Sequence, residues 1–345
     1  MSHLRYDVTT HDWVIFAPDR KMRPRDFSKT DGAASGEGAC PFCVAAWKGV
    51  QPVLMSVPDP EDPDAWSVTV LDNKFPALSL SATGGFIEQG RHFQEFDGYG
   101  AHEVIIESPH HSIPLALQPL AQVERLLSAM QVRYKTLMQD GRLRSIILFK
   151  NHGAQAGTSL RHPHWQIIAT PVVPRLLRQK HAIAMDYYDR SFKCLHQVLM
   201  SEELAGGERI LSQNDSFVAV LPFASHQAYQ IRISPRHFQS CFAQCTELQL
   251  TRLAAILKEV LGRLYSALGD PAFNLTLVSA PIGDENEDYF LWHIDIMPRL
   301  FTSAGFEMGS GMSINTVLPE AAARELSAAA LPESETAMAG GVKSP

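Results

Sequence analysis

The chain has 345 residues, a formal net charge of −7, 45% hydrophobic residues and 19% charged residues. This is the composition of a globular protein long enough for two domains, and its modest acidity argues against a general nucleic-acid-binding protein. The residues 1–10 lack the apolar core of a signal peptide, no apolar run approaches the roughly 18 residues of a membrane span, and five cysteines do not suggest a secreted disulfide framework. We therefore expect a cytoplasmic protein with neither a membrane nor a nucleic acid as partner.

Strand patterns dominate the first half of the chain. Residues 5–18 alternate in polarity, and a basic turn at 20–25 and a Gly/Ala/Ser-rich loop at 29–39 follow them. The spacing of apolar residues predicts a helix over 120–138. Further strands are predicted at 66–71, 103–107, 144–149 and 162–170.

The second half repeats the first. After a helical connector predicted at 174–200, the sequence IIESPHH at 105–111 is echoed by IRISPRH at 231–237. Trp165 and Pro171 recur as Trp292 and Pro298, at an offset of 127. We interpret this as a tandem duplication in an α+β protein whose antiparallel sheets are flanked by helices. The predicted units are 1–172 and 173–326, followed by a disordered tail at 327–345 rich in Ala, Gly, Ser and Glu.

The motif RHPHWQ at 161–166 carries the most specific chemistry. On a strand, His162, His164 and Gln166 would face one side, while Trp165 would point to the other and pack. A neutral imidazole is a good nucleophile toward phosphorus, and the preceding loop with Gly153 and Gly157 could bring backbone N–H groups to phosphate oxygens. At the 127-residue offset the second copy has Tyr289, Leu291 and His293 instead, so we expect it to lack the catalytic site.

The stretch FKNHGAQAGTSLRHPHWQ at 149–166 resembles the active-site motif H-P-H-x-Q of galactose-1-phosphate uridylyltransferases, in the histidine-triad superfamily. This resemblance implies that His164 is the catalytic nucleophile that becomes nucleotidylated and that Gln166 binds the transferred phosphoryl group. Histidine-triad hydrolases usually have a third His where Gln166 stands. Glutamine has no titratable proton with which to activate water, so it favours transfer over hydrolysis.

The resemblance extends over residues 5 to 325 and implies further binding residues. The segment APDRKMRP carries over Arg20 and Arg23 as phosphate ligands, and the segment DNKFPA places Asn73 and Phe75 near the nucleotide. Asn151 and Ser159 match residues that contact phosphates. Glu307 and Asn315, in AGFEMGSGMSIN, match the hexose-binding segment. In the family that segment reaches the partner subunit's active site, so the resemblance also implies a homodimer.

Cys40 and Cys43, in CPFC, have a spacing that lets both thiolates reach one Zn²⁺, and the remaining ligands would have to be histidines. The resemblance supplies His111 and His162, giving a structural Cys₂His₂ zinc site. A redox CxxC pair and ordinary core cysteines are the alternatives. Some family members hold a second metal near WHIDIMP at 292–298, but His293 and Asp295 make an incomplete set there, and we do not predict that site.

The predicted reaction is a ping-pong transfer of UMP between UDP-glucose and galactose 1-phosphate through a covalent uridylyl-histidine. Its substrates are then a nucleotide sugar and a sugar 1-phosphate. One alternative is an adenylyl transferase or phosphorylase that acts on ADP-glucose or another nucleotide with phosphate as acceptor. A second alternative is a histidine-triad nucleotide hydrolase, and a third is a non-enzymatic protein organised by zinc.

Overall fold

The computed structural model describes residues 2–22, 40–43, 51–89 and 92–333. A ten-stranded sheet with antiparallel neighbours forms the centre of the molecule, in the order β10-β11-β12-β14-β13-β8-β9-β7-β4-β3. The strands are β3 (Val53–Pro58), β4 (Trp66–Asp72), β7 (Ala101–Ile106), β8 (Ser145–His152), β9 (His164–Thr170), β10 (Ile210–Gln213), β11 (Phe217–Val220), β12 (Ile231–Pro235), β13 (Phe273–Val278) and β14 (His293–Pro298).

The two halves of the sheet have equivalent strand orders when each is read outward from the middle of the sheet. Strands β8, β9, β7, β4 and β3 lie on one side, and β13, β14, β12, β11 and β10 lie on the other. The halves meet where β8 pairs with β13, with Lys150 opposite Leu275. This arrangement confirms the predicted fold class, with the finding that the two units share one sheet. The domain boundary at 172/173 stays a prediction.

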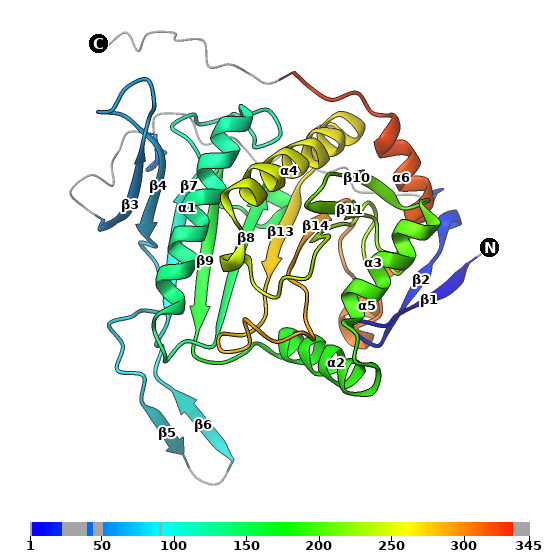
Figure 1. The fold of residues 1–345 in the computed structure, drawn as a ribbon, viewed down its shortest axis with the longest axis horizontal. Helices are drawn as coiled ribbons and strands as arrows, with labels where there is room; N and C mark the ends of the chain where they lie inside the picture. The colour runs from blue at the N-terminus through cyan, green and yellow to red at the C-terminus, as the bar shows by residue number, and fades with distance from the viewer. Residues whose placement is uncertain (1, 23–39, 44–50, 90–91, 334–345) are drawn as a thin grey trace.

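Two long helices cover one face of this sheet. In Figure 1, α1 (Leu120–Met138) and α4 (Glu247–Leu268) lie side by side in front of the strands, and the two helices are in contact. Both helices contribute to the main hydrophobic core, together with alternate residues of the strands. Trp165, Ile167 and Ala169 of β9 belong to that core, so His164 and Gln166 lie on the opposite face. The packing role expected for Trp165 is confirmed, because the side chain is 0% exposed.

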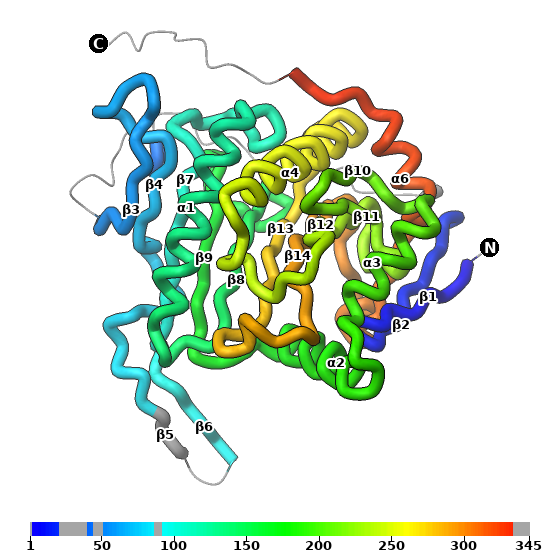
Figure 2. Tube along the Cα trace, viewed as in Figure 1, coloured from blue at the N-terminus to red at the C-terminus, as the bar shows by residue number. Residues whose placement is uncertain are grey.

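The connector between the halves differs from the single helix predicted. It consists of α2 (Arg175–Ser191) and α3 (Leu195–Gly206), separated at Phe192, whose φ of 54° ends α2 in a left-handed conformation. Helix α2 packs on the sheet face opposite α1, through Leu177 and Ala184 against Val278. The tube in Figure 2 follows this turn between α2 and α3.

The N-terminal strands β1 (His3–Asp7) and β2 (Asp12–Phe16) form a small separate sheet with β15 (Ile314–Asn315). This sheet sits beside the second half of the molecule, next to α6 (Pro319–Ala328), as Figure 1 shows. The guanidinium of Arg5 pairs with Glu320 of α6 at 2.9 Å, and Arg209, just before β10, pairs with the same carboxylate at 2.8 Å. The hairpin is therefore anchored at the β10 side of the large sheet.

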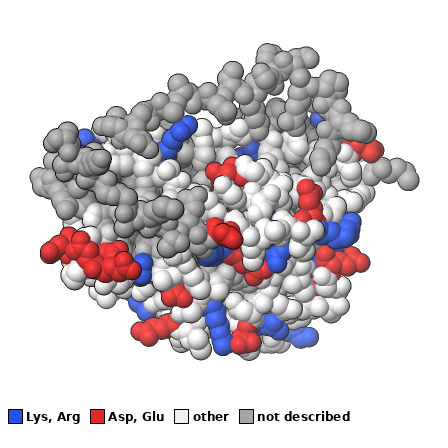
Figure 3. Space-filling model, turned by 90° about the horizontal axis from the view of Figure 1, so that it is seen from above, with Lys and Arg blue, Asp and Glu red and all other residues white. Residues whose placement is uncertain are grey.

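The remaining elements are short. The hairpin of β5 (Phe86–Gln89) and β6 (Phe93–Phe96) extends from the body, and the short helices are η1 (Pro18–Met22), η3 (Ala154–Ala156), η4 (Phe242–Gln244) and α5 (Gly305–Ser310). On the face in Figure 3, acidic and basic side chains are intermixed among the described residues. Within the described residues, no helix has the length and apolar character needed to cross a bilayer. The predicted tail lies mostly in residues 334–345, outside the described residues.

Candidate active site and metal centre

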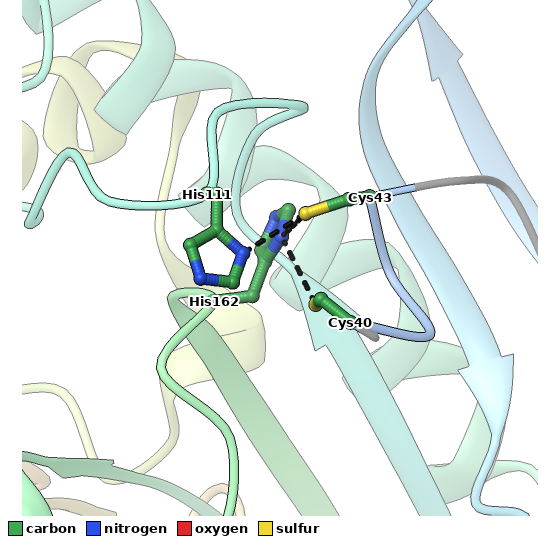
Figure 4. Close-up of side chains that lie close together, drawn as sticks. All are labelled: Cys40, Cys43, His111 and His162. Carbon is green, nitrogen blue, oxygen red and sulfur yellow. Dashed lines mark hydrogen bonds between the residues drawn. The ribbon is translucent and has the colours of Figure 1, made fainter. Parts of the chain in front are cut away.

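The four predicted metal ligands come together at one end of β9 (Figure 4). Cys40 and Cys43 approach from the N-terminal segment, His111 from the loop after β7, and His162 from the residues just before β9. Their ligand atoms all lie within 4.8 Å of one another. The neighbouring His110 is exposed and is not part of this group.

The distances in this Cys/His cluster suit a tetrahedral metal. The Cys43 Sγ atom lies 2.9 Å from His111 Nδ1 and 3.4 Å from His162 Nδ1, and Cys40 Sγ lies 3.9 Å from the latter. A zinc ion with ordinary Zn–S and Zn–N bonds would hold its S and N ligands about 3.5 Å apart. On the far side of the ring, His162 Nε2 lies 2.8 Å from the carbonyl oxygen of Ser108.

That contact fixes the protonation pattern of His162. A carbonyl only accepts hydrogen bonds, so Nε2 carries the proton and Nδ1 presents its lone pair to the cysteines. Burial lowers the pKa of His162 and keeps the ring neutral, as a metal ligand must be. The residues therefore fit a structural zinc site, which would bind the segment 40–43 to the start of β9.

His164 is placed as a free nucleophile. Its Nδ1 donates to the carbonyl oxygen of His162 at 2.8 Å, which leaves the lone pair on Nε2. Burial lowers the pKa of His164, and the nearby charge of Lys150 lowers it further, so the imidazole is neutral at neutral pH. Because His162 belongs to the Cys/His cluster, the cluster also holds the carbonyl that orients the nucleophile.

A buried ion pair lies beside the start of β9, on the face of the sheet opposite His164. Lys150 of β8 is paired with Glu107, and the two side chains are 1% and 0% exposed. The Lys150 ammonium also lies 3.5 Å from the carbonyl oxygen of His164. The pair therefore joins β8, β9 and the end of β7 directly beneath the nucleophile.

Replacing Glu107 by glutamine is expected to lower the free energy of unfolding by about 3–5 kcal/mol, because it leaves the Lys150 charge buried without a counter-ion. Urea unfolding monitored by circular dichroism measures this loss. The double variant Glu107→Leu/Lys150→Met removes both charges and should be markedly more stable than Glu107→Gln alone. Equal stability of wild type and Glu107→Gln would show that the pair does not support the fold.

The two amides predicted to bind phosphate share the face of the sheet that His164 occupies. Phe149 of β8 lies opposite Gln166 of β9, and extending this register by two residues places Asn151 opposite His164. In each amide the carbonyl oxygen already accepts a hydrogen bond. Gln166 Oε1 lies 2.8 Å from His102 Nε2, and Asn151 Oδ1 accepts from Asn274 Nδ2 at 2.7 Å. Both amides can therefore present N–H donors to a phosphate.

The glycine loop after β8 forms one tight turn. Gly153 has a φ of 79°, and a Cβ atom there would meet the Cβ of Ala272 at 2.7 Å, so only glycine fits. Gly157 has a φ of 85° and closes the turn. Ser159 follows as an exposed residue between this turn and His162. The loop thus connects Asn151 at the end of β8 with His162, just before β9, and His164, the first residue of β9.

The segment at 73–77 reaches the same region through His102. The Asn73 backbone N–H donates to the carbonyl oxygen of His102 at 2.9 Å, and the Asn73 side chain accepts from the Phe75 N–H at 2.9 Å. Phe75 is 81% exposed, which leaves its ring open to stack on a base. The sequence alone did not identify His102 as a site residue. Its alternation with Val104 predicts only that the two side chains share one face of β7. The hydrogen bond between His102 and Gln166 could be predicted only if β7 and β9 were known to be neighbours.

Other predicted ligands are not brought to His164 within one chain. Arg20 is exposed on η1, next to the β1–β2 hairpin, and Glu307 lies on α5, where its carboxylate accepts from the Ala304 N–H at 3.1 Å. Arg23 lies outside the described residues. Asn315 is 2% exposed, and its amide bonds to Ser225 O and to the Val317 N–H, so in this chain it stabilises a turn. Its role in sugar binding stays a prediction.

An ion-pair cluster surrounds His293 and Asp295, the two residues that make only an incomplete set of ligands for a second metal. Asp295 accepts two hydrogen bonds from Arg232, at 2.7 and 2.9 Å, and the Lys180 ammonium lies 3.8 Å away. Burial alone would raise the Asp295 pKa, but these cations lower it far below its usual range. His293 lies 3.6 Å from the same carboxylate. Cations of the protein thus compensate the Asp295 charge.

Two further histidines beside this cluster should make the protein sensitive to acid. Burial lowers the pKa of His181 to about 4 and that of His196 to about 3, from an ordinary 6.5. As the pH falls below 6.5, the unfolded state binds protons that the native state excludes, so stability falls with pH. From pH 7 to pH 5 each histidine should cost about 2 kcal/mol.

Urea unfolding at pH 7 and pH 5 tests this prediction. His181→Phe should remove about one histidine's share of the loss, because a phenyl ring fits against Phe290, whose ring centroid lies 4.4 Å from that of His181. An unchanged pH dependence in His181→Phe would contradict the assignment.

Comparison with known proteins agrees with the geometry. Residues 1–174 match the family model described as galactose-1-phosphate uridyl transferase, N-terminal domain. ADP-glucose phosphorylase of Arabidopsis thaliana is 34% identical over 93% of this chain and 91% of its own. Galactose-1-phosphate uridylyltransferase of Thermotoga maritima is 29% identical over 94% of this chain and 98% of its own.

A crystal structure of the Arabidopsis thaliana ADP-glucose phosphorylase with bound ADP-glucose superimposes with a TM-score of 0.82 at 32% identity. The superposition covers 96% of this chain and 100% of that one. The motif at 161–166, the sheet that presents it and the similarity along nearly the whole chain all lead to one assignment. This protein belongs to the galactose-1-phosphate uridylyltransferase family of nucleotidyltransferases.

Proposed function

We propose that this protein transfers UMP between UDP-glucose and galactose 1-phosphate through a covalent uridylyl group on His164. The observation that carries the proposal is the state of His164: Nδ1 is bonded to a carbonyl, and Nε2 keeps its lone pair. Family membership supports nucleotidyl transfer, and the amides of Gln166 and Asn151 supply donors on the same face of the sheet.

In the first half-reaction, His164 Nε2 attacks the α-phosphorus of the nucleotide sugar. The N–P bond forms as the bond from that phosphorus to the bridging oxygen breaks, and glucose 1-phosphate leaves with the electron pair. The Nδ1–H bond to His162 O stays in place and stabilises the positive charge that develops on the ring. The N–H donors of Gln166 and Asn151 can bind the non-bridging oxygens.

In the second half-reaction, a phosphate oxygen of the acceptor attacks the same phosphorus and the N–P bond breaks. The lone pair returns to His164 Nε2, so no net proton transfer to the ring is required. Gln166 can bind oxygens but has no titratable proton with which to activate water. This disfavours the hydrolase alternative, and the intermediate persists until a phosphate-bearing acceptor arrives. A bound zinc ion would serve structurally, by holding residues 40–43 against the start of β9.

A second candidate is adenylyl transfer from ADP-glucose to inorganic phosphate. It is favoured by the 34% identity to a relative that carries the name ADP-glucose phosphorylase. A product assay should offer each of UDP-glucose and ADP-glucose with either galactose 1-phosphate or phosphate. UDP-galactose formed from the first pair supports the proposal. Formation of ADP from ADP-glucose and phosphate alone would replace it with the phosphorylase, and UMP or AMP release without an acceptor would favour the hydrolase.

We also propose that the active enzyme is a homodimer in which Arg20 and Glu307 serve the partner's site. In support, their segments lie on the β10 side of the molecule, and six strand spacings, roughly 30 Å, separate β10 from β9. The alternative of a non-enzymatic protein organised by zinc does not require residues of one subunit in the active site of the other.

Subunit complementation tests the shared site. Arg20→Ala and His164→Ala variants should each be inactive alone, and mixed dimers should regain part of the wild-type activity. Inactive mixed dimers, or an active monomer by light scattering, would contradict the proposal.

A further inference from the structure

We propose that His102 is a positioning residue, which orients the Gln166 amide so that its NH₂ group, and not its carbonyl, faces the transferred phosphoryl group. This inference rests on the proposed function of His164 and Gln166. His102 is the second residue of β7 and lies opposite Ile168 of β9. Gln166, two residues before Ile168, is its diagonal neighbour on the same face of the sheet.

The hydrogen bonds of His102 define its tautomer. The backbone N–H of Ala77 donates to His102 Nδ1 at 3.1 Å, so this nitrogen carries the lone pair. In the neutral ring the proton is then on Nε2, which donates to Gln166 Oε1 at 2.8 Å. The Asn73 amide nitrogen lies 3.0 Å from Nε2, but two donors cannot bond to each other, so that approach is a packing contact.

The orientation of the Gln166 amide matters because phosphate oxygens at neutral pH are acceptors. If the amide flipped, its carbonyl oxygen would face them and repel them. The N–H of His102 Nε2 disfavours this flip, because the flip would remove the Gln166 carbonyl oxygen that accepts its hydrogen bond. Among the described residues, Gln166 Nε2 has no hydrogen-bond acceptor, so both its hydrogens remain available to substrate.

His102 also fixes the segment that contains Asn73 and Phe75. Its carbonyl oxygen accepts from the Asn73 N–H at 2.9 Å, and its ring accepts from the Ala77 N–H. One residue thus links the predicted nucleotide segment to the predicted phosphoryl-binding amide. The residue is half-buried and lies on the face of β7 opposite Ala101 and Ile105, which belong to the main core.

The test compares His102→Phe with His102→Gln. Phenylalanine keeps the ring but has no donor, and kcat for nucleotidyl transfer should fall about tenfold to a hundredfold with KM changed less than about threefold. Glutamine places an amide N–H near the position of Nε2 and should restore most of the loss. His237→Phe, the same substitution at an exposed histidine of the second half, is the control and should behave as wild type.

A double-mutant cycle separates positioning from general support of the fold. In a Gln166→Ala background, His102→Phe should cause little further loss of kcat, since its target is gone. The same fold-loss in both backgrounds, or wild-type kinetics in His102→Phe, would overturn the inference. Absence of nucleotidyl transfer by the wild-type enzyme would instead refute the proposed function, so the two failures are distinguishable.

Discussion

Replacing His164 by alanine is expected to lower nucleotidyl transfer at least about a thousandfold, because the side chain supplies the only nitrogen that forms the covalent bond in the proposed route. The loss should appear in kcat with either donor, since both half-reactions pass through the same N–P bond. Steady-state kinetics with UDP-glucose and ADP-glucose measure it.

The fold of this variant should persist, since the Cys/His cluster does not include the His164 side chain. His110→Ala, at an exposed histidine beside the cluster, provides the matched control and should keep wild-type turnover. A His164→Ala enzyme with near wild-type turnover would exclude the covalent route, whatever the identity of the donor.

Loss of the metal ligands is expected to have the second largest effect. Cys40→Ser should lower zinc content from about one ion per chain to a small fraction, and turnover should fall at least about tenfold. The physical link is the carbonyl of His162, which accepts from His164 Nδ1. When the cluster no longer holds His162, that carbonyl is less well fixed and the nucleophile loses its orientation.

Cys194→Ser is the control for the metal experiment, because this cysteine is buried elsewhere and bonds to Tyr289 O. Zinc analysis, thermal unfolding and turnover should all resemble wild type in this control. If wild-type protein stripped of metal by a chelator kept its melting temperature and its turnover, the structural role of the cluster would be refuted.

Local patterns predicted much of this fold. The helix over 120–138 has the bounds expected from apolar spacing, and the alternation in RHPHWQ placed Trp165 in the core and His164 on the opposite face. The Cys/His cluster was also predicted: the CxxC spacing indicated two ligands, and the family resemblance supplied His111 and His162. The helix and the strand faces depend on residues near in sequence, whereas the full ligand set depended on the resemblance.

What sequence reasoning missed depends on long-range pairing. The edge-to-edge joining of β8 and β13 makes one sheet of two units, and no local pattern encodes that register. The bond between His102 and Gln166 requires that β7 and β9 be neighbours. The burial of Asn315 and the hydrogen bond from its amide to Ser225 O also depend on long-range packing, which the segment AGFEMGSGMSIN does not reveal.

The most direct measurement of the central claim is intact-mass spectrometry of the protein after incubation with UDP-glucose and, separately, with ADP-glucose. We predict one added UMP per chain with UDP-glucose, and no addition in His164→Ala. An AMP adduct formed only with ADP-glucose would keep the mechanism and change the base to adenine. A folded, zinc-loaded wild-type protein that turns over a donor without any adduct under single-turnover conditions would contradict the covalent His164 mechanism.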